Sequence, residues 1–223
     1  MIQSFKDHCI AEATAESVVI NFGRFNPPTN GHEKLLNASV KLATGVHRVY
    51  PSQSVDAKKN PLGFSDKVKF MRKMYPKHAR SILMDKSVRS FFDALVVAHN
   101  DGFKKCTVVV GSDRVKEFDK ALNKYNGVKS KHGFYEFDGG INVISAGERD
   151  PDSDDVSGMS ASKLRAAATD NDLITFTKGM PKGFKGAEAL MNAVRSGMGL
   201  KESTTYRKET KLKIISMLRE KYI

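Results

Sequence analysis

The sequence predicts an α/β fold around a mainly parallel sheet, and three observations support this prediction. Short β-branched apolar runs alternate with amphipathic segments at intervals of about 25–30 residues, which is typical of strand–helix–strand units. Hydrophobic residues make up 40% and charged residues 28% of the 223-residue chain, as in ordinary globular proteins. The longest apolar runs, such as 94–98, are far shorter than the roughly 20 residues of a membrane-spanning helix. We therefore expect one domain with a small appendage.

The expected elements follow one another in a regular order. Apolar β-branched runs predict strands at 18–22, from Val46, at 81–84 (a weak signal), at 106–110 and at 141–145. Apolar residues at helical spacing predict helices at 32–43, 64–75, 90–99, 113–124, 160–168 and 170–178. Ser65 is the expected N-cap of the second helix. Because ligands of such sheets bind beyond the carboxyl ends of the strands, the loops after Phe22, Tyr50, Val110 and Ser145 are expected to carry the chemistry.

The pattern changes after Lys178. Glycine and proline residues between 179 and 186 predict a hinge, and 187–194 is expected to be helical and to end at Ser196 and Gly197. The apolar residues of 211–222 fall near one face of a helix, which predicts an amphipathic tail. We therefore divide the chain into a domain at 1–178 and a basic helical extension at 179–223.

The chain is strongly basic. It has 37 Lys and Arg against 25 Asp and Glu, a net charge of +12. Ten basic and four acidic residues lie between Lys182 and the last residue, so this segment carries half of the excess. Such an excess favours nucleic acid, a membrane surface or phosphorylated small molecules as partners, and a solvated basic surface is the alternative. For the tail helix, docking on the core or on a second copy of the chain is favoured over nucleic acid or membrane.

The cysteines and histidines indicate neither a disulfide framework nor a metal site. Cys9 and Cys106 are the two cysteines, and they have no metal-binding or redox spacing, which predicts a reduced, cytoplasmic protein. The start of the sequence has no apolar core of the signal-peptide type. The histidines outside the segment 23–32 lack ligand spacing, so we predict no protein-held metal.

The segment 23–32, GRFNPPTNGH, joins the first predicted strand to the first predicted helix. Gly23 would let the backbone approach a ligand closely, and the N–H groups and dipole at a helix start favour phosphate. Arg24 adds a planar cation suited to phosphate. Thr29 and His32 are three residues apart across the turn, so a hydroxyl and an imidazole can face one point. We interpret this segment as a functional phosphate-binding loop.

A second segment, 157–165, reads SGMSASKLR. Ser160 and Ser162 would lie in the first turn of a helix, with Arg165 about one turn further on, which makes a second anion site. An alanine-rich helix with an ordinary serine N-cap is the alternative interpretation of this segment alone. Next to the first motif, the anion site is favoured.

These two motifs together resemble those of the nucleotidyltransferase superfamily. GRFNPPTNGH is similar to its HxGH signature, with Thr29 in place of the first His, as in the T-x-G-H of phosphopantetheine adenylyltransferases. The opening Gly23-Arg24-Phe25 is closer to archaeal-type nicotinamide mononucleotide adenylyltransferases, and the combination resembles phage-encoded relatives. Residues 159–165 are similar to the family's ISSTxxR motif, except that Ala161 removes one hydroxyl. Over 17–178 the resemblance implies a Rossmann-like, doubly wound parallel sheet.

Two shorter segments also resemble this family. Residues 58–65, KKNPLGFS, are similar to the K-K-P…F-S segment of phosphopantetheine adenylyltransferases, where a lysine reaches the reacting phosphates. Lys58 or Lys59 would do so here, and a solvated pair in a loop is the alternative. Residues 111–113, GSD, resemble the G-x-D of nucleotide adenylyltransferases, in which Asp113 would accept hydrogen bonds from ribose. A helix cap made by Ser112 or Asp113 is the alternative.

The resemblance implies a nucleotidyltransferase that uses ATP in preference to CTP, with Mg²⁺ screening the triphosphate and pyrophosphate as the product. The predicted catalytic residues are His32, Thr29, Lys59 and Arg165. The predicted nucleotide-binding residues are Gly23, Arg24, Phe25, Asn26, Gly31, Lys58, Gly111, Asp113, Met159, Ser160 and Ser162.

The acceptor stays open between three classes of phosphorylated molecule. The Gly23-Arg24 pair and residues 111–113 favour a mononucleotide such as nicotinamide mononucleotide, which implies NAD biosynthesis. Thr29 and the lysine segment favour phosphopantetheine, and cytidylyl transfer to a phosphorylated alcohol is the third option. A non-catalytic module that binds nucleotide or nucleic acid is the alternative from another class. A phage-like origin would place the protein in the host cytoplasm.

Overall fold

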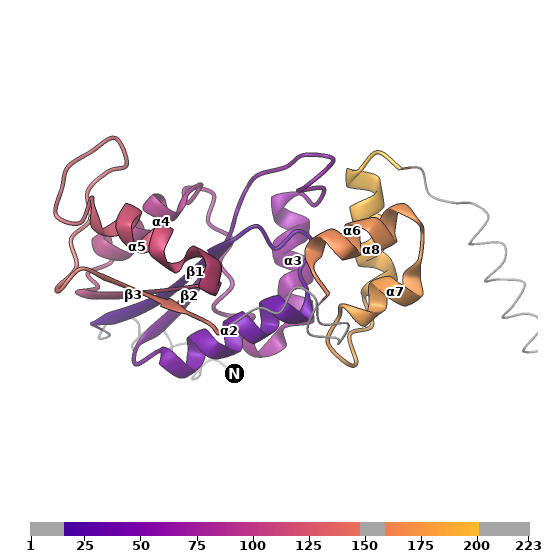
Figure 1. The fold of residues 1–223 in the computed structure, drawn as a ribbon, viewed down its shortest axis with the longest axis horizontal. Coiled ribbons are helices and arrows are strands. Elements are labelled where there is room, and N and C mark those ends of the chain that lie inside the picture. Colours follow the sequence, from indigo (N-terminus) through magenta and orange to yellow (C-terminus); the bar gives the residue numbers. More distant parts are fainter. Residues whose placement is uncertain (1–15, 148–158, 201–223) are drawn as a thin grey trace, which may run out of the picture.

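The computed structural model describes residues 16–147 and 159–200 (Figure 1). The predicted tail helix, Cys9, and the Ser157-Gly158 opening of the second motif lie outside these residues. The strands are β1 (Ser17–Gly23), β2 (Val46–Pro51), β3 (Lys105–Val110) and β4 (Ile141–Ser145). The helices are α2 (Asn30–Leu42), α3 (Phe64–Met74), η1 (Pro76–His78), α4 (Phe91–Asn100), η2 (Ser112–Arg114), α5 (Val115–Asn123), α6 (Ala161–Thr169), α7 (Leu173–Lys178) and α8 (Ala187–Gly197).

The four strands form one parallel sheet in the order β2-β1-β3-β4. Val19 of β1 lies opposite His47 of β2, and Val18 lies opposite Cys106 of β3. After β2 the chain crosses back to the other side of β1 to form β3, so the winding direction reverses at β1. This order confirms the predicted Rossmann-like α/β fold, and it makes the carboxyl end of β1 the expected ligand position.

Each face of the sheet buries its own apolar cluster. Ile20, Val108 and Leu95 belong to the cluster under α4 and α5. Leu36 and Met71 belong to the cluster that α2 and α3 cover on the opposite face. On the strands, Val18 and Val110 also belong to the first cluster and Val49 to the second, as expected for a sheet covered on both sides.

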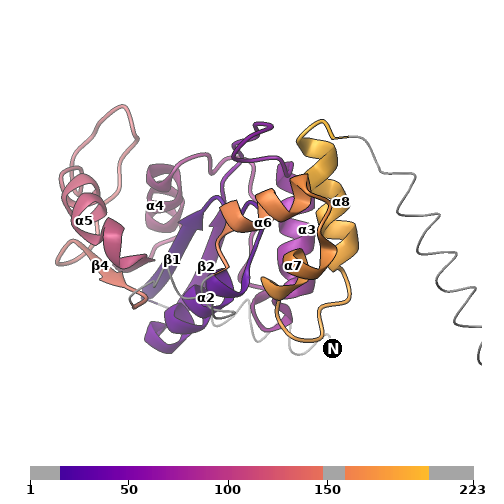
Figure 2. The ribbon, with the colours of Figure 1, turned by 45° about the vertical axis from the view of Figure 1, so that its right-hand side comes forward.

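The last three helices pack on one another beside α3 (Figure 2). Leu164 of α6, Phe176 of α7 and Leu190 of α8 are fully buried in the same cluster as α3. The guanidinium of Arg195 on α8 donates to the carbonyl oxygen of Ala168, at the end of α6. The boundary at residue 178 falls between α7 and α8, which contact each other, and where the functional unit ends stays a prediction.

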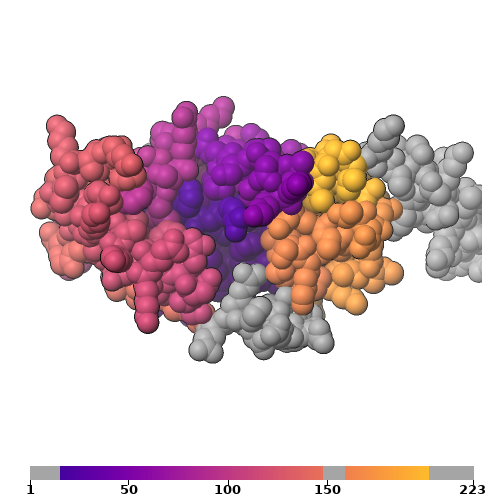
Figure 3. All heavy atoms as spheres, turned by 45° about the horizontal axis from the view of Figure 1, so that its top comes forward, coloured from indigo at the N-terminus to yellow at the C-terminus, as the bar shows by residue number. Residues whose placement is uncertain are grey.

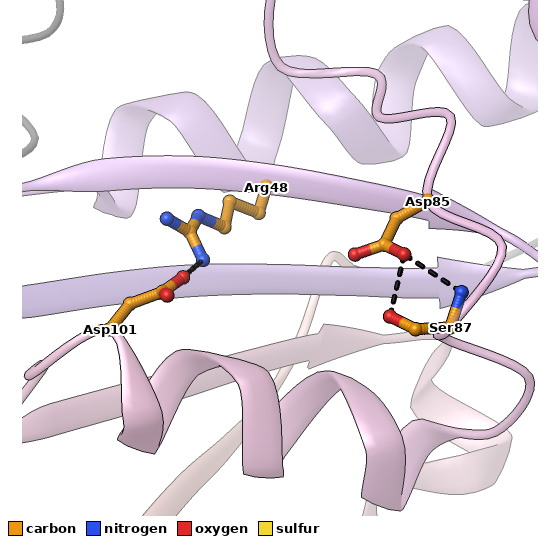
Figure 4. A network of polar contacts seen from close by, with 4 residues as sticks. All are labelled: Arg48, Asp85, Ser87 and Asp101. Atoms are coloured by element: carbon orange, nitrogen blue, oxygen red, sulfur yellow. Dashed lines mark hydrogen bonds and ion pairs between the residues drawn. The ribbon is translucent and has the colours of Figure 1, made fainter.

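A polar network fixes the segment between β2 and α4 (Figure 4). Arg48 of β2 forms an ion pair with Asp101, which ends α4, and its guanidinium lies 4.8 Å from the ring centre of Phe103. The Asp85 carboxylate accepts hydrogen bonds from the amide (2.8 Å) and hydroxyl (2.6 Å) of Ser87. The ion pair joins the end of α4 to β2, and the Asp85 bonds fix a turn in the loop before α4.

Two local predictions are wrong, and one predicted helix is confirmed with a later start. Ser65 lies inside α3, whose N-cap is Gly63 without a side-chain hydrogen bond. The segment 81–84 forms no strand, because it pairs with β2 only around Val49, through an isolated bridge to Ile82, before the chain turns away. The helix expected at 170–178 begins only at Leu173, with the Asp172 side chain as its N-cap.

Within the described ranges, no helix has the length and hydropathy needed to cross a membrane.

Candidate phosphate-binding site

The start of α2 positions His32. Thr29 is the N-cap, buried and extended, and its backbone N–H donates to Nδ1 of His32 over 3.0 Å. The Thr29 hydroxyl oxygen in turn accepts from the backbone N–H of His32 over 3.4 Å, which completes a capping box. Because Nδ1 is an acceptor, the proton of the neutral ring resides on Nε2. The fold therefore selects a His32 tautomer that can donate from Nε2.

Phe25 packs beneath this histidine. Its ring is 2% exposed and meets the His32 ring edge-on, with centroids 4.9 Å apart. A Cβ on Gly23 would lie 3.0 Å from the Phe25 ring, so the glycine makes room for that ring rather than for a ligand. Phe25 also has φ of 45°, which is strained for a bulky residue and persists where surrounding contacts enforce it.

Asn26 joins three segments of the site. Its side chain is buried and bonds both backbone groups of Leu62, accepting from N–H at 3.0 Å and donating to C=O at 3.1 Å. Its own carbonyl oxygen accepts from the Arg165 guanidinium at 2.8 Å. Asn26 therefore links three parts of the structure: the segment 23–32, the loop between β2 and α3 that carries Lys58 and Lys59 (the lysine loop), and α6.

The start of α6 brings two hydroxyls to the site. The Ser160 hydroxyl oxygen accepts from the Lys163 amide at 3.1 Å as the N-cap of α6, and it lies 2.8 Å from the Ser162 hydroxyl. Burial lowers the pKa of Arg165, the positive charge of Arg24 lowers it further, and Asp56 opposes the change. Two guanidinium groups thus lie close enough to repel each other, which favours an anion between them.

These elements enclose a cavity of about 220 Å³ beyond the carboxyl end of β1. Three of its lining side chains are cationic and none is a carboxylate. Its lining residues are Arg24, Phe25, Asn26, His32, Lys59, Ser160, Ala161, Ser162 and Arg165. Figure 3 shows the indigo residues, the first that the structure describes, at the surface between the orange C-terminal helices and the pink region of α5. Cations, hydroxyls and a helix start around one hollow fit phosphate groups.

The lining does not fit a resident Mg²⁺, because hard cations bind through carboxylates or several oxygen ligands. Within the described ranges there is also no group of three or more metal-ligating side chains. Any Mg²⁺ would therefore enter with a triphosphate as part of the substrate.

The other predicted site residues do not line the cavity. Thr29 contacts His32, and Met159 packs against the core cluster of α3. Asp113 is exposed at the end of β3, where a Cβ on Gly111 would lie 2.7 Å from its Oδ1. Neither Asp113 nor Ser112 caps η2 or α5 through its side chain, so that alternative is wrong. The remaining members of this set are Gly23, Gly31 and Lys58.

Gly31 is a distinct case because the protein itself leaves space for a side chain there. A Cβ at this position would lie 3.6 Å from the Thr29 hydroxyl oxygen, an ordinary van der Waals contact. Glycine lowers helix stability relative to alanine, and here no packing requirement explains it. Close approach of a ligand to the first turn of α2 would explain the glycine at this position.

Sequence reasoning missed two supporting residues. Asp56 accepts three hydrogen bonds within the lysine loop. The Tyr75 hydroxyl is buried and donates to the carbonyl oxygen of Thr29 over 2.7 Å. The spacing D-x-x-K-N at 56–60 is typical of an Asx turn and could have indicated Asp56, whereas nothing in the sequence near Tyr75 indicates its partner.

Comparison with known proteins relates this fold to adenylyltransferases. No protein-family model and no curated protein matches the chain. A bifunctional nicotinamide mononucleotide adenylyltransferase/ADP-ribose pyrophosphatase from Francisella tularensis, solved with AMP and a manganese ion, is similar with a TM-score of 0.55 and 12% identity. The match covers 90% of this chain and 56% of that one. A candidate nicotinate-nucleotide adenylyltransferase from Vibrio parahaemolyticus gives a TM-score of 0.49 and 20% identity over 79% of this chain and 99% of that one.

The fold of this chain is thus similar to that of a nicotinamide mononucleotide adenylyltransferase. This confirms the resemblance inferred from the motifs at the level of the fold. The relation to phage-encoded proteins stays a prediction.

Proposed function

We propose that this protein is an adenylyltransferase that transfers AMP from ATP to the phosphate of a small molecule, with nicotinamide mononucleotide as the favoured acceptor. An acceptor phosphate oxygen attacks the α-phosphorus of ATP, the bond from that phosphorus to the bridging oxygen breaks, and pyrophosphate leaves with the electron pair. The observation that carries this proposal is that the side chains of Arg24, Lys59, Arg165 and His32 line one and the same cavity.

The charge balance of the cavity suits two phosphorylated substrates. Attack of a phosphate on a triphosphate brings two anions together, and their repulsion is the main barrier to approach. The three cations offset it, and the charge of Arg24 lowers the pKa of Arg165, as expected for two cations that an anion would bridge. The Ser160 and Ser162 hydroxyls at the start of α6 would bind the departing pyrophosphate, where N–H groups and the helix dipole favour negative charge.

His32 would stabilise the transition state. Its Nε2–H can donate to an oxygen of the α-phosphate as negative charge develops there, because Thr29 holds Nδ1 as the acceptor. No deprotonation of the acceptor is needed, since its phosphate is already anionic. Catalysis therefore consists of positioning and charge stabilisation.

The nature of the acceptor is supported by fewer observations. The Gly23-Arg24-Phe25 opening and the exposed Asp113 at the end of β3 favour a mononucleotide, as does the similar fold of the Francisella enzyme. Phosphopantetheine and CTP-dependent transfer are the competing assignments. The predicted amphipathic tail helix at 211–222 is proposed to form a homo-oligomer, which solution mass before and after its removal would test.

The deciding experiment measures pyrophosphate release with Mg²⁺, crossing ATP and CTP with nicotinamide mononucleotide, nicotinate mononucleotide, phosphopantetheine and phosphocholine. Release that requires ATP and a pyridine mononucleotide supports the proposal, and His32→Ala should then lower kcat by about 100-fold to 1,000-fold with unchanged circular dichroism. Lys69→Ala, at an exposed position of α3, serves as the folded control. Release with another pair reassigns the acceptor, and near-normal turnover of His32→Ala removes its assigned role.

A further inference from the structure

The lysine loop between β2 and α3 is closed by its own backbone. The amide of Asp56 donates to the carbonyl oxygen of Asn60 over 3.0 Å, and the amide of Asn60 returns a bond to Asp56 over 3.1 Å. These two bonds fix the base of the loop, whereas they leave its tip, 57–59, without a backbone partner of this kind. Lys59 lies in this tip and lines the cavity.

The Asp56 carboxylate organises that tip. Its Oδ1 accepts from the backbone amides of Lys58 (3.0 Å) and Lys59 (2.6 Å). Its Oδ2 accepts from the side-chain amide of Asn60 over 2.6 Å. All three partners are donors, so the position needs a group that accepts on both oxygens, which a carboxylate does and a carboxamide does only in part.

The same carboxylate bears on the electrostatics of the cavity although it does not line it. The Lys59 amide, followed by the Asn60 side chain, lowers the pKa of Asp56, so the group is ionised at neutral pH. Its negative charge is the one that opposes the lowering of the Arg165 pKa. Asp56 therefore lies near the cations, while its oxygens are occupied by the loop rather than turned to the cavity.

We propose that Asp56 is a positioning residue that holds the tip of the 56–60 loop so that the Lys59 ammonium faces the phosphates of the substrate. This inference rests on the proposed function only for the identity of the ligand that Lys59 meets. The hold of Asp56 on the loop can be tested without any ligand.

The test compares Asp56→Ala, Asp56→Asn, Lys59→Ala and the double variant Asp56→Ala/Lys59→Ala, with Asp66→Ala as the control. Asp66 is an exposed aspartate in the first turn of α3. The Kd of Mg-ATP is measured by calorimetry without acceptor. Lys59→Ala and Asp56→Ala should each weaken binding by about fivefold to tenfold. The double variant should be no weaker than Lys59→Ala, and Asp56→Asn should fall between wild type and Asp56→Ala because its Oδ1 still accepts from the loop amides.

Two outcomes would overturn the proposal. The first is an Asp56→Ala affinity equal to that of Asp66→Ala. The second is an additive double variant, which would mean that Asp56 acts independently of Lys59.

Amide hydrogen exchange separates this proposal from the proposed function. Asp56→Ala should accelerate exchange at the Lys58 and Lys59 amides and leave α3 unchanged, because the base of the loop keeps its backbone bonds. If wild-type protein binds no ATP but these amides respond, the function fails and the positioning stands. If the amides exchange at the wild-type rate in Asp56→Ala, the positioning fails whatever binds.

Discussion

Replacing Lys67 by methionine should stabilise the protein at neutral pH. Lys67 of α3 is fully buried, and its ammonium donates to the carbonyl oxygen of Ser52 over 2.6 Å. Burial lowers the pKa of Lys67 from 10.5 to about 8. That difference corresponds to about 3 kcal/mol by which the charged form disfavours folding. Losing the bond to Ser52 costs about 1–3 kcal/mol, so we expect a net gain of up to about 2 kcal/mol.

The pH dependence gives a sharper test than the net gain. Between pH 8 and 10.5 the unfolded chain keeps the Lys67 proton while the folded protein releases it, so wild-type stability rises with pH across this window. Lys67→Met lacks this rise. Its advantage at pH 7 should therefore shrink by about 3 kcal/mol by pH 10.5 and end as a disadvantage.

Urea unfolding followed by circular dichroism at pH 7 and pH 10 would measure this change, since the chain has no tryptophan. Comparing the variant with wild type at each pH cancels the titration of all other groups. Lys69→Met, at an exposed lysine of the same helix, should change stability little and equally at both pH values. An offset between Lys67→Met and wild type that is the same at both pH values would refute the assignment of a depressed pKa to Lys67.

Three further predictions concern glycines and a histidine. Gly197→Ala should destabilise the protein by about 2 kcal/mol or more in urea unfolding, because its Cβ would lie 1.9 Å from the Pro61 carbonyl oxygen, whereas Ser196→Ala should be neutral. Gly31→Ala should raise stability by about 0.5 kcal/mol yet weaken Mg-ATP binding, and unimpaired binding would show that no ligand approaches α2 there. Burial, and then the charge of His78, lowers the pKa of His47 from 6.5 to about 4. The free energy of unfolding should therefore fall by up to about 3 kcal/mol between pH 6.5 and 4, where the unfolded chain binds a proton that the folded protein does not. Unfolding curves of wild type and His47→Gln that shift equally with pH would contradict this.

The parts of the fold that sequence could predict are those with local physical signals. The strand at 141–145 has its predicted bounds, because an apolar β-branched run between glycine and loop residues has few other solutions. Ser160 caps α6 as its position before an alanine-rich run suggests. The prediction that Ser65 is an N-cap was wrong because a serine can cap a helix only at the residue that precedes its first turn, and in α3 that residue is Gly63.

The candidate site was predictable only where one motif contains the interacting groups. Thr29 and His32 are three residues apart, and their capping box follows from that spacing. The bonds from Asn26 to Leu62 and to Arg165 span 36 and 139 residues, so only the assembled fold reveals them. The burial of Lys67 was not predicted, for a different reason. A lysine in an amphipathic helix is expected at the surface, and the helical pattern alone does not show that it lies on the buried side.

Helix α8 carries none of the sequence motifs, yet it contacts two of the segments that contribute residues to the cavity or adjoin them. Arg195 binds the end of α6, the helix that presents Arg165, and Gly197 lies against Pro61, which follows the lysine loop. A shortened chain that stops at residue 178 would keep every motif residue but lose the helix that contacts both the end of α6 and Pro61. The shortest segment worth producing for activity measurements therefore ends after Leu200, whose amide closes α8 by a bond to Arg195.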